Sequence, residues 1–369
     1  MRTIQSAEIF VIESRPLGDQ REHNPEIRGS VMSFYTYVSI SGEGKILRFS
    51  LDPSDGSLEL LGETAAPGRP APMAASPDRG YVYVGRRDDL EVSSFRLDAA
   101  TGDLGLVGTA GLESDPCFMS TDRAGRYLLS AYYNAGHAAV HAIGGDGAVS
   151  GPPVEWVATG TGAHCFQTDP TNRYGYVPHI AAGPGPNAIF QFRFDGETGR
   201  ITPNDPPRVS PENPDGPRHF CFHPSRDIIY VSNEQGCSVT GYNLDPATGG
   251  LSPFQTLSTL PEGFSERNSC SQIQITPNGK YVYAPNRGHN SIAGFAVGDD
   301  GRLTALGQTP SEAVPRAFGI DPTGSYLYSA GLESGKLAAF RIDDATGALE
   351  RIDTYDVGEG PMWVLIVEV

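Results

Sequence analysis

The residues best suited to chemistry lie in one short stretch, 216–237, where a carboxylate and two basic side chains are close in sequence. Apolar alternation on both sides of a Pro-Ser-Arg-Asp turn predicts an antiparallel hairpin. The predicted strands are Phe220–His223 and Ile228–Ser232. Because the start of one strand lies beside the end of the next, Arg218 and His219 should meet Glu234 at the open end of the hairpin. Glu234 could activate water or accept a substrate proton. The alternative is an ion pair with Arg218 that joins structural units.

A second candidate is His164, which lies in the segment Thr161-Gly-Ala-His-Cys-Phe at the start of another predicted strand. A neutral imidazole can serve as a general acid or base near pH 7. The alternative is a structural role, in which His164 forms a hydrogen bond that caps the contact between neighbouring units. The sequence does not decide which of His164 and Glu234 would act as the base.

Arginines occupy comparable positions in three successive segments, at Arg218, Arg287 and Arg316. A guanidinium group binds carboxylate or phosphate through two parallel hydrogen bonds and can also stabilise an oxyanion. Structural ion pairing is the alternative for each of them. We therefore predict a catalytic set of His164, Glu234 and Arg287. The predicted substrate-binding set is Arg218, His219, Arg316, His179, Asn286 and His289. For the histidines of this set, and for His137, the alternative is a structural or solvated role.

No motif for a metal or an organic cofactor stands out. His137 and His141 would lie on one side of a strand, but no third ligand accompanies them. The sequence also contains no serine nucleophile elbow, no phosphate-binding glycine loop and no dinucleotide fingerprint. We predict an enzyme that uses neither metal nor cofactor.

The elements that must position these residues follow from an internal repeat. A phrase of the form Pro-x-Gly-x-Tyr-x-Tyr, followed by Phe-x-x-Asp-x-x-Thr-Gly-x-Leu, recurs along the chain. Its turns recur every 45 to 54 residues, at Pro77, Asp122, Pro170, Pro224, Pro277 and Pro322. A degenerate first copy covers residues 35–62, which gives seven units. Each unit holds about four short alternating strands and shows no helical period.

This pattern predicts an all-β, seven-bladed β-propeller with four antiparallel strands per blade, formed as a single domain over residues 1–369. The last segment, Pro361–Val369, resembles only a first strand, so we expect it to complete the N-terminal blade and close the ring. Two stacked sandwiches are the alternative. In a four-stranded meander, the Pro-x-Gly and Asp-x-x-Thr-Gly turns share one face of the ring. The candidate residues all fall on the opposite face, near the axis, where a site is expected.

Composition sets the remaining bounds. A formal charge of −17 over 369 residues repels phosphate backbones and argues against a nucleic-acid partner. The five cysteines are widely spaced, and Cys165 and Cys221 alternate with apolar residues, which indicates buried free thiols and a reducing compartment. Neither a signal-peptide core nor a membrane-spanning run is evident. We expect a soluble, cytoplasmic protein with a small anionic substrate and no membrane partner. The oligomeric state cannot be inferred.

Four segments carry a resemblance to a known family. They are 216–224, 232–234, 277–292 and 315–324. Together they resemble the seven-bladed propeller lactonases, a family that includes the propeller-type 6-phosphogluconolactonases of bacteria and the fungal carboxy-cis,cis-muconate cyclase. The resemblance implies metal-independent lactone chemistry, with His164, Arg218, Glu234 and Arg287 at the site positions of the family. The chain departs from the phosphogluconolactonases at 177–187, where His179 stands in place of an acidic residue.

The leading hypothesis is an enzyme that hydrolyses a sugar-acid lactone, with 6-phosphogluconolactone as the first candidate. His164 or Glu234 would activate water, while Arg218 and Arg287 would hold the anionic substituent and the developing oxyanion. One alternative is a lactonising cycloisomerase that adds a substrate carboxylate across a double bond. Another is a propeller without catalytic activity that serves as a binding platform.

Overall fold

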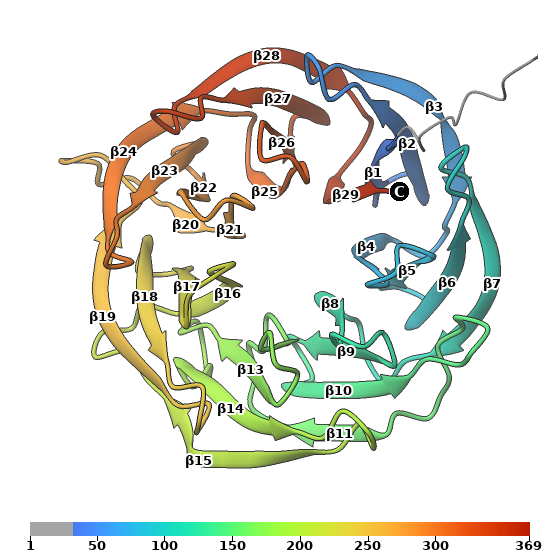
Figure 1. The fold of residues 1–369 in the computed structure, drawn as a ribbon, viewed down its shortest axis with the longest axis horizontal. Coiled ribbons are helices and arrows are strands. Elements are labelled where there is room, and N and C mark those ends of the chain that lie inside the picture. The colour runs from blue at the N-terminus through green and yellow to red at the C-terminus, as the bar shows by residue number, and fades with distance from the viewer. Residues whose placement is uncertain (1–31) are drawn as a thin grey trace, which may run out of the picture. The chain divides into compact units, whose positions relative to one another are not determined.

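The computed structural model describes residues 32–369, and Ser33–Val369 form one compact unit. Within this range every element is a β-strand, and the strands form seven sheets arranged as blades around a central axis (Figure 1). The chain passes once around the ring, so neighbouring blades are consecutive in sequence. The prediction of an all-β, seven-bladed propeller is confirmed. Residues 1–31 of the predicted domain lie outside the described range.

We number the blades 1 to 7 in chain order and give the strands from the axis outward. Blade 1 contains β29 (Pro361–Glu368), β1 (Phe34–Ile40), β2 (Lys45–Leu51) and β3 (Leu58–Ala65). Blade 2 contains β4 (Pro70–Ala75), β5 (Tyr81–Arg86), β6 (Glu91–Leu97) and β7 (Leu104–Gly111). Blade 3 contains β8 (Phe118–Thr121), β9 (Tyr127–Tyr132), β10 (His137–Ala142) and β11 (Glu155–Ala158). Blades 4 and 5 contain β12 (Gln167–Thr168), β13 (Tyr174–His179), β14 (Ala188–Phe194) and β15 (Ile201–Val209); β16 (Pro217–Phe222), β17 (Ile228–Asn233), β18 (Ser238–Leu244) and β19 (Leu251–Ser258). Blades 6 and 7 contain β20 (Ser269–Cys270), β21 (Gln274–Ile275), β22 (Tyr281–Arg287), β23 (Ser291–Val297) and β24 (Leu303–Pro310); β25 (Pro315–Ile320), β26 (Tyr326–Gly331), β27 (Lys336–Ile342) and β28 (Leu349–Asp356).

The two ends of the described chain close the ring in blade 1. The C-terminal strand β29 is its innermost strand and pairs antiparallel with β1, from Phe34 opposite Glu368 to Ile40 opposite Pro361. Figure 1 shows the red C-terminal strand beside the blue β1 near the axis. The predicted closure by the terminal segments is therefore confirmed. The hydrogen bonds between β29 and β1 join the end of the described chain to its first strand and so close the ring.

The repeated sequence phrase explains the contacts between blades on the face that carries the Pro-x-Gly and Asp-x-x-Thr-Gly turns, which we call the turn face. In five blades a buried tyrosine of the second strand donates its hydroxyl to the carbonyl of the turn glycine of the next blade. The pairs are Tyr37 to Gly102, Tyr176 to Gly249, Tyr230 to Gly301, Tyr283 to Gly347 and Tyr328 to Gly56, at 2.6–2.9 Å. Each of these hydroxyls is thereby removed from water without the loss of a hydrogen bond.

The glycine of this turn is required on two grounds, as Gly347 shows. Its φ is +71°, in the left-handed region that favours glycine. A Cβ atom at this position would lie 2.3 Å from Cδ1 of Tyr281, which packs against the turn. The Asp343 carboxylate accepts hydrogen bonds from the backbone N–H groups of Ala345 and Thr346 and fixes the turn from inside. The Asp-x-x-Thr-Gly turn and the two tyrosines that contact it, Tyr281 and Tyr283, therefore form one structural unit.

The hairpin of blade 5 differs from its prediction at both ends. The strand β16 runs from Pro217 to Phe222, so Arg218 and His219 lie within it and not ahead of it. Asn233 likewise belongs to β17, and Glu234 is the first residue after that strand. The prediction placed the strands too far toward the turn because polar residues were taken as loop. The five cysteines are all free, as predicted, although Cys221 is half-buried.

Candidate active site

Two β-bulges place Arg218 and Arg316 at the axis of the ring. Pro217 pairs with Asn233, and His219 pairs with Ser232, so Arg218 is the extra residue of its strand. The same shift occurs in blade 7 between Pro315 and Ala317, which makes Arg316 the extra residue there. A bulge changes the direction in which a side chain points relative to the regular pleat. Equivalent Pro-Arg pairs in blades 5 and 7 thus bring two guanidinium groups close together near the axis.

Glu234 binds two arginines at once, Arg218 and Arg287. Its Oε2 accepts a hydrogen bond from Nε of Arg218 at 2.7 Å and lies 3.3 Å from Nη2 of Arg287 in the next blade. Arg218 is only 2% exposed and Glu234 is 16% exposed, so the ion pairs are largely shielded from water. No hydrogen bond from residues 32–369 reaches Oε1 of Glu234. One carboxylate oxygen is therefore fixed, and the other is free to bind water or substrate.

His164 and His219 form a hydrogen-bonded pair between blades 4 and 5. Nδ1 of His164 lies 3.3 Å from Nε2 of His219, and the tautomer decides which ring donates. Burial, and then the charge of Arg218, lower the pKa of both imidazoles well below the usual value. Both rings are therefore neutral near pH 7. A neutral imidazole beside an arginine can accept a proton when an anionic substrate reduces the positive field.

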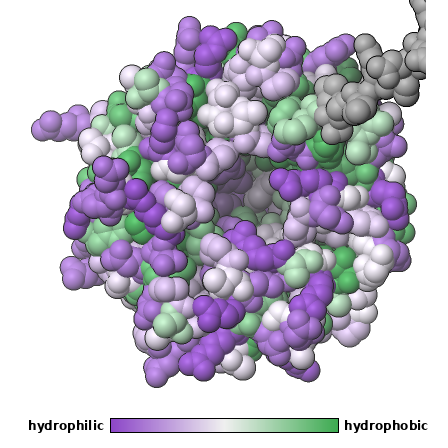
Figure 2. Space-filling model, viewed as in Figure 1, coloured by the Kyte–Doolittle hydropathy of each residue, from purple (hydrophilic) through white to green (hydrophobic). Residues whose placement is uncertain are grey.

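Two adjoining cavities lie close to Arg218 and His219, whereas His164, Glu234 and Arg287 line neither of them. The inner cavity holds about 10 Å³, enough for one water molecule, and the outer cavity about 500 Å³. Their shared walls are formed by Arg87, Arg316 and Met362. The inner cavity also touches Arg218 and His219, whereas the outer cavity extends to Arg69. Figure 2 shows that the centre of the ring is open on the face seen there and is bordered largely by hydrophilic side chains.

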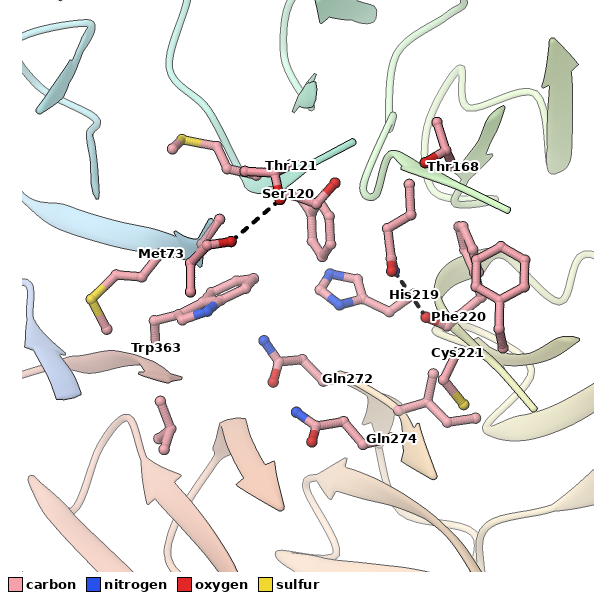
Figure 3. A pocket seen from close by; sticks show the side chains of 18 of the residues that line it. Met73, Ser120, Thr121, Thr168, His219, Phe220, Cys221, Gln272, Gln274 and Trp363 are labelled. Carbon is pink, nitrogen blue, oxygen red and sulfur yellow. Dashed lines mark hydrogen bonds between the residues drawn. The ribbon is translucent and has the colours of Figure 1, made fainter. Parts of the chain in front are cut away.

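A chamber of about 460 Å³ lies on the far side of His219, Gln272 and Trp363, which line both this chamber and the inner cavity. Figure 3 shows these three side chains directed toward the axis from different blades. The ring of Phe118 packs edge-on against His219 at 5.1 Å and against Trp363 at 5.8 Å. The aromatic cluster therefore divides the central channel. The far chamber has mostly neutral walls and lacks the paired charges of the candidate site.

Arg218 and Arg316 share an unusual electrostatic environment. Burial is the main cause that lowers the pKa of each guanidinium, and repulsion from Arg287 is the next. Glu234 opposes this effect for both. Nη1 of Arg218 is buried and has no hydrogen-bond partner within the described chain. The site therefore concentrates positive charge beyond what its single central carboxylate balances.

Three predicted substrate-binding residues lie away from these cavities. His179 is fully buried and binds the carbonyl of Val177 and the hydroxyl of Thr159, each at 2.9 Å. Asn286 is also fully buried and donates to the carbonyl of Thr259 at 2.9 Å. His289 contacts Ser291 at 2.7 Å and packs against Phe264. These contacts tie all three side chains to neighbouring residues of the protein, and we do not include them in the proposed site. His137 similarly stacks on Trp156.

Sequence reasoning missed several residues that line the cavities. Arg87 follows the second strand of blade 2, in the same position as Glu234 in blade 5, and this equivalence could have identified it. Arg69 lies just before the first strand of its blade, as predicted site residues do. Trp363 and Gln272 had no such signal because they lie in the C-terminal strand and in the gap between β20 and β21.

The described residues contain no cluster of three or more His, Cys, Asp and Glu that could hold a metal ion. The candidate groups are instead arginines, a carboxylate and an imidazole pair, which together suit acid–base chemistry on an anionic substrate. Across residues 32–369 we also find no helix long and apolar enough to cross a membrane.

Comparisons with known proteins agree with this arrangement. A family model described as "Lactonase, 7-bladed beta-propeller" matches residues 31–366. The 6-phosphogluconolactonase of Pectobacterium carotovorum subsp. carotovorum is 38% identical over 315 residues, which cover 85% of this chain and 93% of that protein. The 6-phosphogluconolactonase of Cronobacter sakazakii is 38% identical over 331 residues, which cover 89% and 97%.

Among solved structures, the periplasmic gluconolactonase of Pseudomonas aeruginosa superposes with a TM-score of 0.83 at 24% identity. The superposition covers 91% of this chain and 99% of that chain, which supports the fold. The family model and the two relatives each extend over most of the described ring. The chain therefore belongs to the lactonase family of seven-bladed β-propellers.

Proposed function

We propose that this protein hydrolyses a sugar-acid lactone, with 6-phosphogluconolactone as the leading substrate. The observation that supports this most directly is the convergence of Arg218, Glu234 and Arg287 from two blades beside the imidazole pair. The curated relatives named 6-phosphogluconolactonase, at 35–38% identity, support the choice of substrate.

In the proposed reaction, water attacks the lactone carbonyl, the ring C–O bond breaks, and a hydroxy acid forms and releases a proton. His164 accepts the proton of the attacking water and returns it to the ring oxygen that leaves. The guanidinium groups of Arg218 and Arg287 stabilise the oxyanion. Glu234 holds both guanidinium groups in place, because its Oε2 binds each of them. We assign the base to His164 since the charge of Glu234 is already engaged by two cations.

The test is acid release from 6-phosphogluconolactone, followed with a pH indicator and corrected for spontaneous hydrolysis. We expect His164→Ala and Glu234→Gln each to lower kcat by roughly 100-fold or more, as loss of a general base or of an oxyanion-positioning group does. The matched control is Glu350→Gln, because Glu350 pairs with Arg341 on the exposed side of a blade and should leave the rate intact.

Full activity in both variants would refute the assignment. A wild-type protein that releases no acid but consumes the ultraviolet absorbance of a carboxymuconate would instead indicate the cycloisomerase. Absence of both activities would favour a binding platform without catalytic activity.

A cytoplasmic location is part of the same proposal. All five cysteines lie within the described residues and none forms a disulfide, which is usual in a reducing compartment. Cell fractionation followed by detection of the protein tests this location, and recovery in the periplasmic fraction would contradict it.

A further inference from the structure

Arg316 is a partly buried cation that has no partner within the described chain. Within residues 32–369 its guanidinium forms neither a hydrogen bond nor an ion pair, although it lines both the inner and the outer cavity. Buried charges in proteins are normally paired, because an isolated charge loses its hydration without compensation. The bulge in β25 nevertheless holds Arg316 at this place. An anion bound in the outer cavity would supply the missing partner.

Two further arginines face the same space. The backbone N–H of Arg87 donates to the carbonyl of Arg69 at 3.2 Å, which holds the two residues side by side. Arg69 has a φ of +57°, an uncommon conformation for a residue other than glycine and one that often marks functional positions. Both side chains line the outer cavity, together with Arg316. The subsite formed by Arg69, Arg87 and Arg316 thus combines residues from blades 2 and 7.

The balance of charge around the two cavities indicates the charge of the ligand. Neither cavity has an aspartate or glutamate among its lining residues. The arginines do have acidic partners outside the walls: Arg69 pairs with Asp88, Arg87 pairs with Asp115, and Glu234 binds two more arginines. Of the four arginines that line the cavities, Arg69 and Arg87 each have an acidic partner, Arg218 shares Glu234 with Arg287, and Arg316 has none within the described chain. The charged side chains in the walls are therefore all cationic, which suits an anionic ligand such as a phosphate monoester.

We propose that Arg69, Arg87 and Arg316 form the subsite that binds the phosphate of the substrate and determines a preference for phosphorylated over unphosphorylated lactones. This inference rests on the proposed lactonase function and assigns its specificity. The outer cavity, at about 500 Å³, is large enough for a ligand of this size. The phosphate lies there, and the lactone carbonyl faces the inner cavity, past Arg316 and toward Arg218.

The experiment compares kcat/KM for 6-phosphogluconolactone with that for glucono-δ-lactone, in the wild type and in Arg316→Met. We expect the wild type to prefer the phosphorylated lactone, and Arg316→Met to reduce this preference by roughly 30-fold, as loss of a charged hydrogen-bonding partner does. Arg87→Met should reduce it in the same direction. The matched control is Arg341→Met, which removes an exposed arginine from the outer part of blade 7 and should leave the ratio as in the wild type.

A second measurement uses inorganic phosphate as the ligand and does not depend on activity. Titration calorimetry should detect phosphate binding to the wild type, and Arg316→Met should weaken it by a similar factor. If the wild type hydrolyses both lactones with equal efficiency and does not bind phosphate, the subsite is wrong while the lactonase function stands. If neither lactone is hydrolysed but phosphate binds and Arg316→Met abolishes the binding, the anion subsite stands and the lactonase function fails. An unchanged preference in Arg316→Met, with normal thermal stability, overturns the assignment.

Discussion

The two faces of the ring differ in how fully their buried polar groups are satisfied. On the turn face, neutral tyrosine hydroxyls meet glycine carbonyls in the same way in five blades, and their hydrogen-bonding demands are met. On the opposite face, which we call the site face, Arg218 and Arg316 differ from the pleat of their strands and carry charge that protein partners balance only in part. One face is built for stability, and the other holds poorly compensated charge ready for an anion.

The comparison predicts that changes on the site face affect activity far more than stability. Arg218→Met should lower kcat/KM for the lactone by roughly 1,000-fold, because the oxyanion loses a buried guanidinium. The free energy of unfolding should stay equal or rise, since Glu234 keeps Arg287 as its partner and a buried positive charge is removed. Enzyme kinetics and urea denaturation measure the two effects. A large loss of stability together with retained kcat/KM would reverse the comparison.

The turn face should show the opposite behaviour, and Gly347→Ala tests it. The added methyl group would require a left-handed backbone at an alanine and would overlap the ring of Tyr281. We expect the free energy of unfolding to fall by about 3 kcal/mol, with kcat per folded molecule unchanged. Gly105→Ala is the matched control, because no atom lies within 4 Å of its added Cβ. Equal stability of the two variants would show that the turn glycines are not structural requirements.

A smaller effect tests whether poorly satisfied groups outside the site also cost stability. His141 in blade 3 is buried, neither ring nitrogen has a hydrogen-bond partner in the described chain although Nε2 lies 3.5 Å from Oε2 of Glu113, and burial lowers its pKa to about 4. As the pH falls below about 6.5, the unfolded chain takes up a proton before the folded protein does, so the folded state loses stability. At pH 5 this loss is about 2 kcal/mol.

His141→Phe removes that proton uptake. The stability of the variant relative to the wild type should therefore improve by about 2 kcal/mol between pH 7 and pH 5. Urea denaturation at the two values measures this change. Parallel stability curves for the two proteins would mean that His141 titrates alike in both states.

The sequence was sufficient to predict the ring because the repeated tyrosines and turn glycines are local signals that recur in each blade. The same regularity predicted which face holds Arg218, Glu234 and Arg287. It did not show that His179 and Asn286 lie within second strands, where both side chains are buried inside the blades. The bulge at Arg218 also could not be inferred, since it depends on pairing with the neighbouring strand.

The position of β29 has a consequence for the synthesis and folding of the protein. This final strand is the innermost strand of blade 1, and it contributes Met362 to both cavities and Trp363 to the wall that divides the channel. During synthesis β29 leaves the ribosome after every other strand of the described ring, so six blades and part of a seventh precede it as an open arc. The cavities are completed only after β29 has been synthesised and paired with β1, so a nascent chain that lacks β29 has no assembled centre.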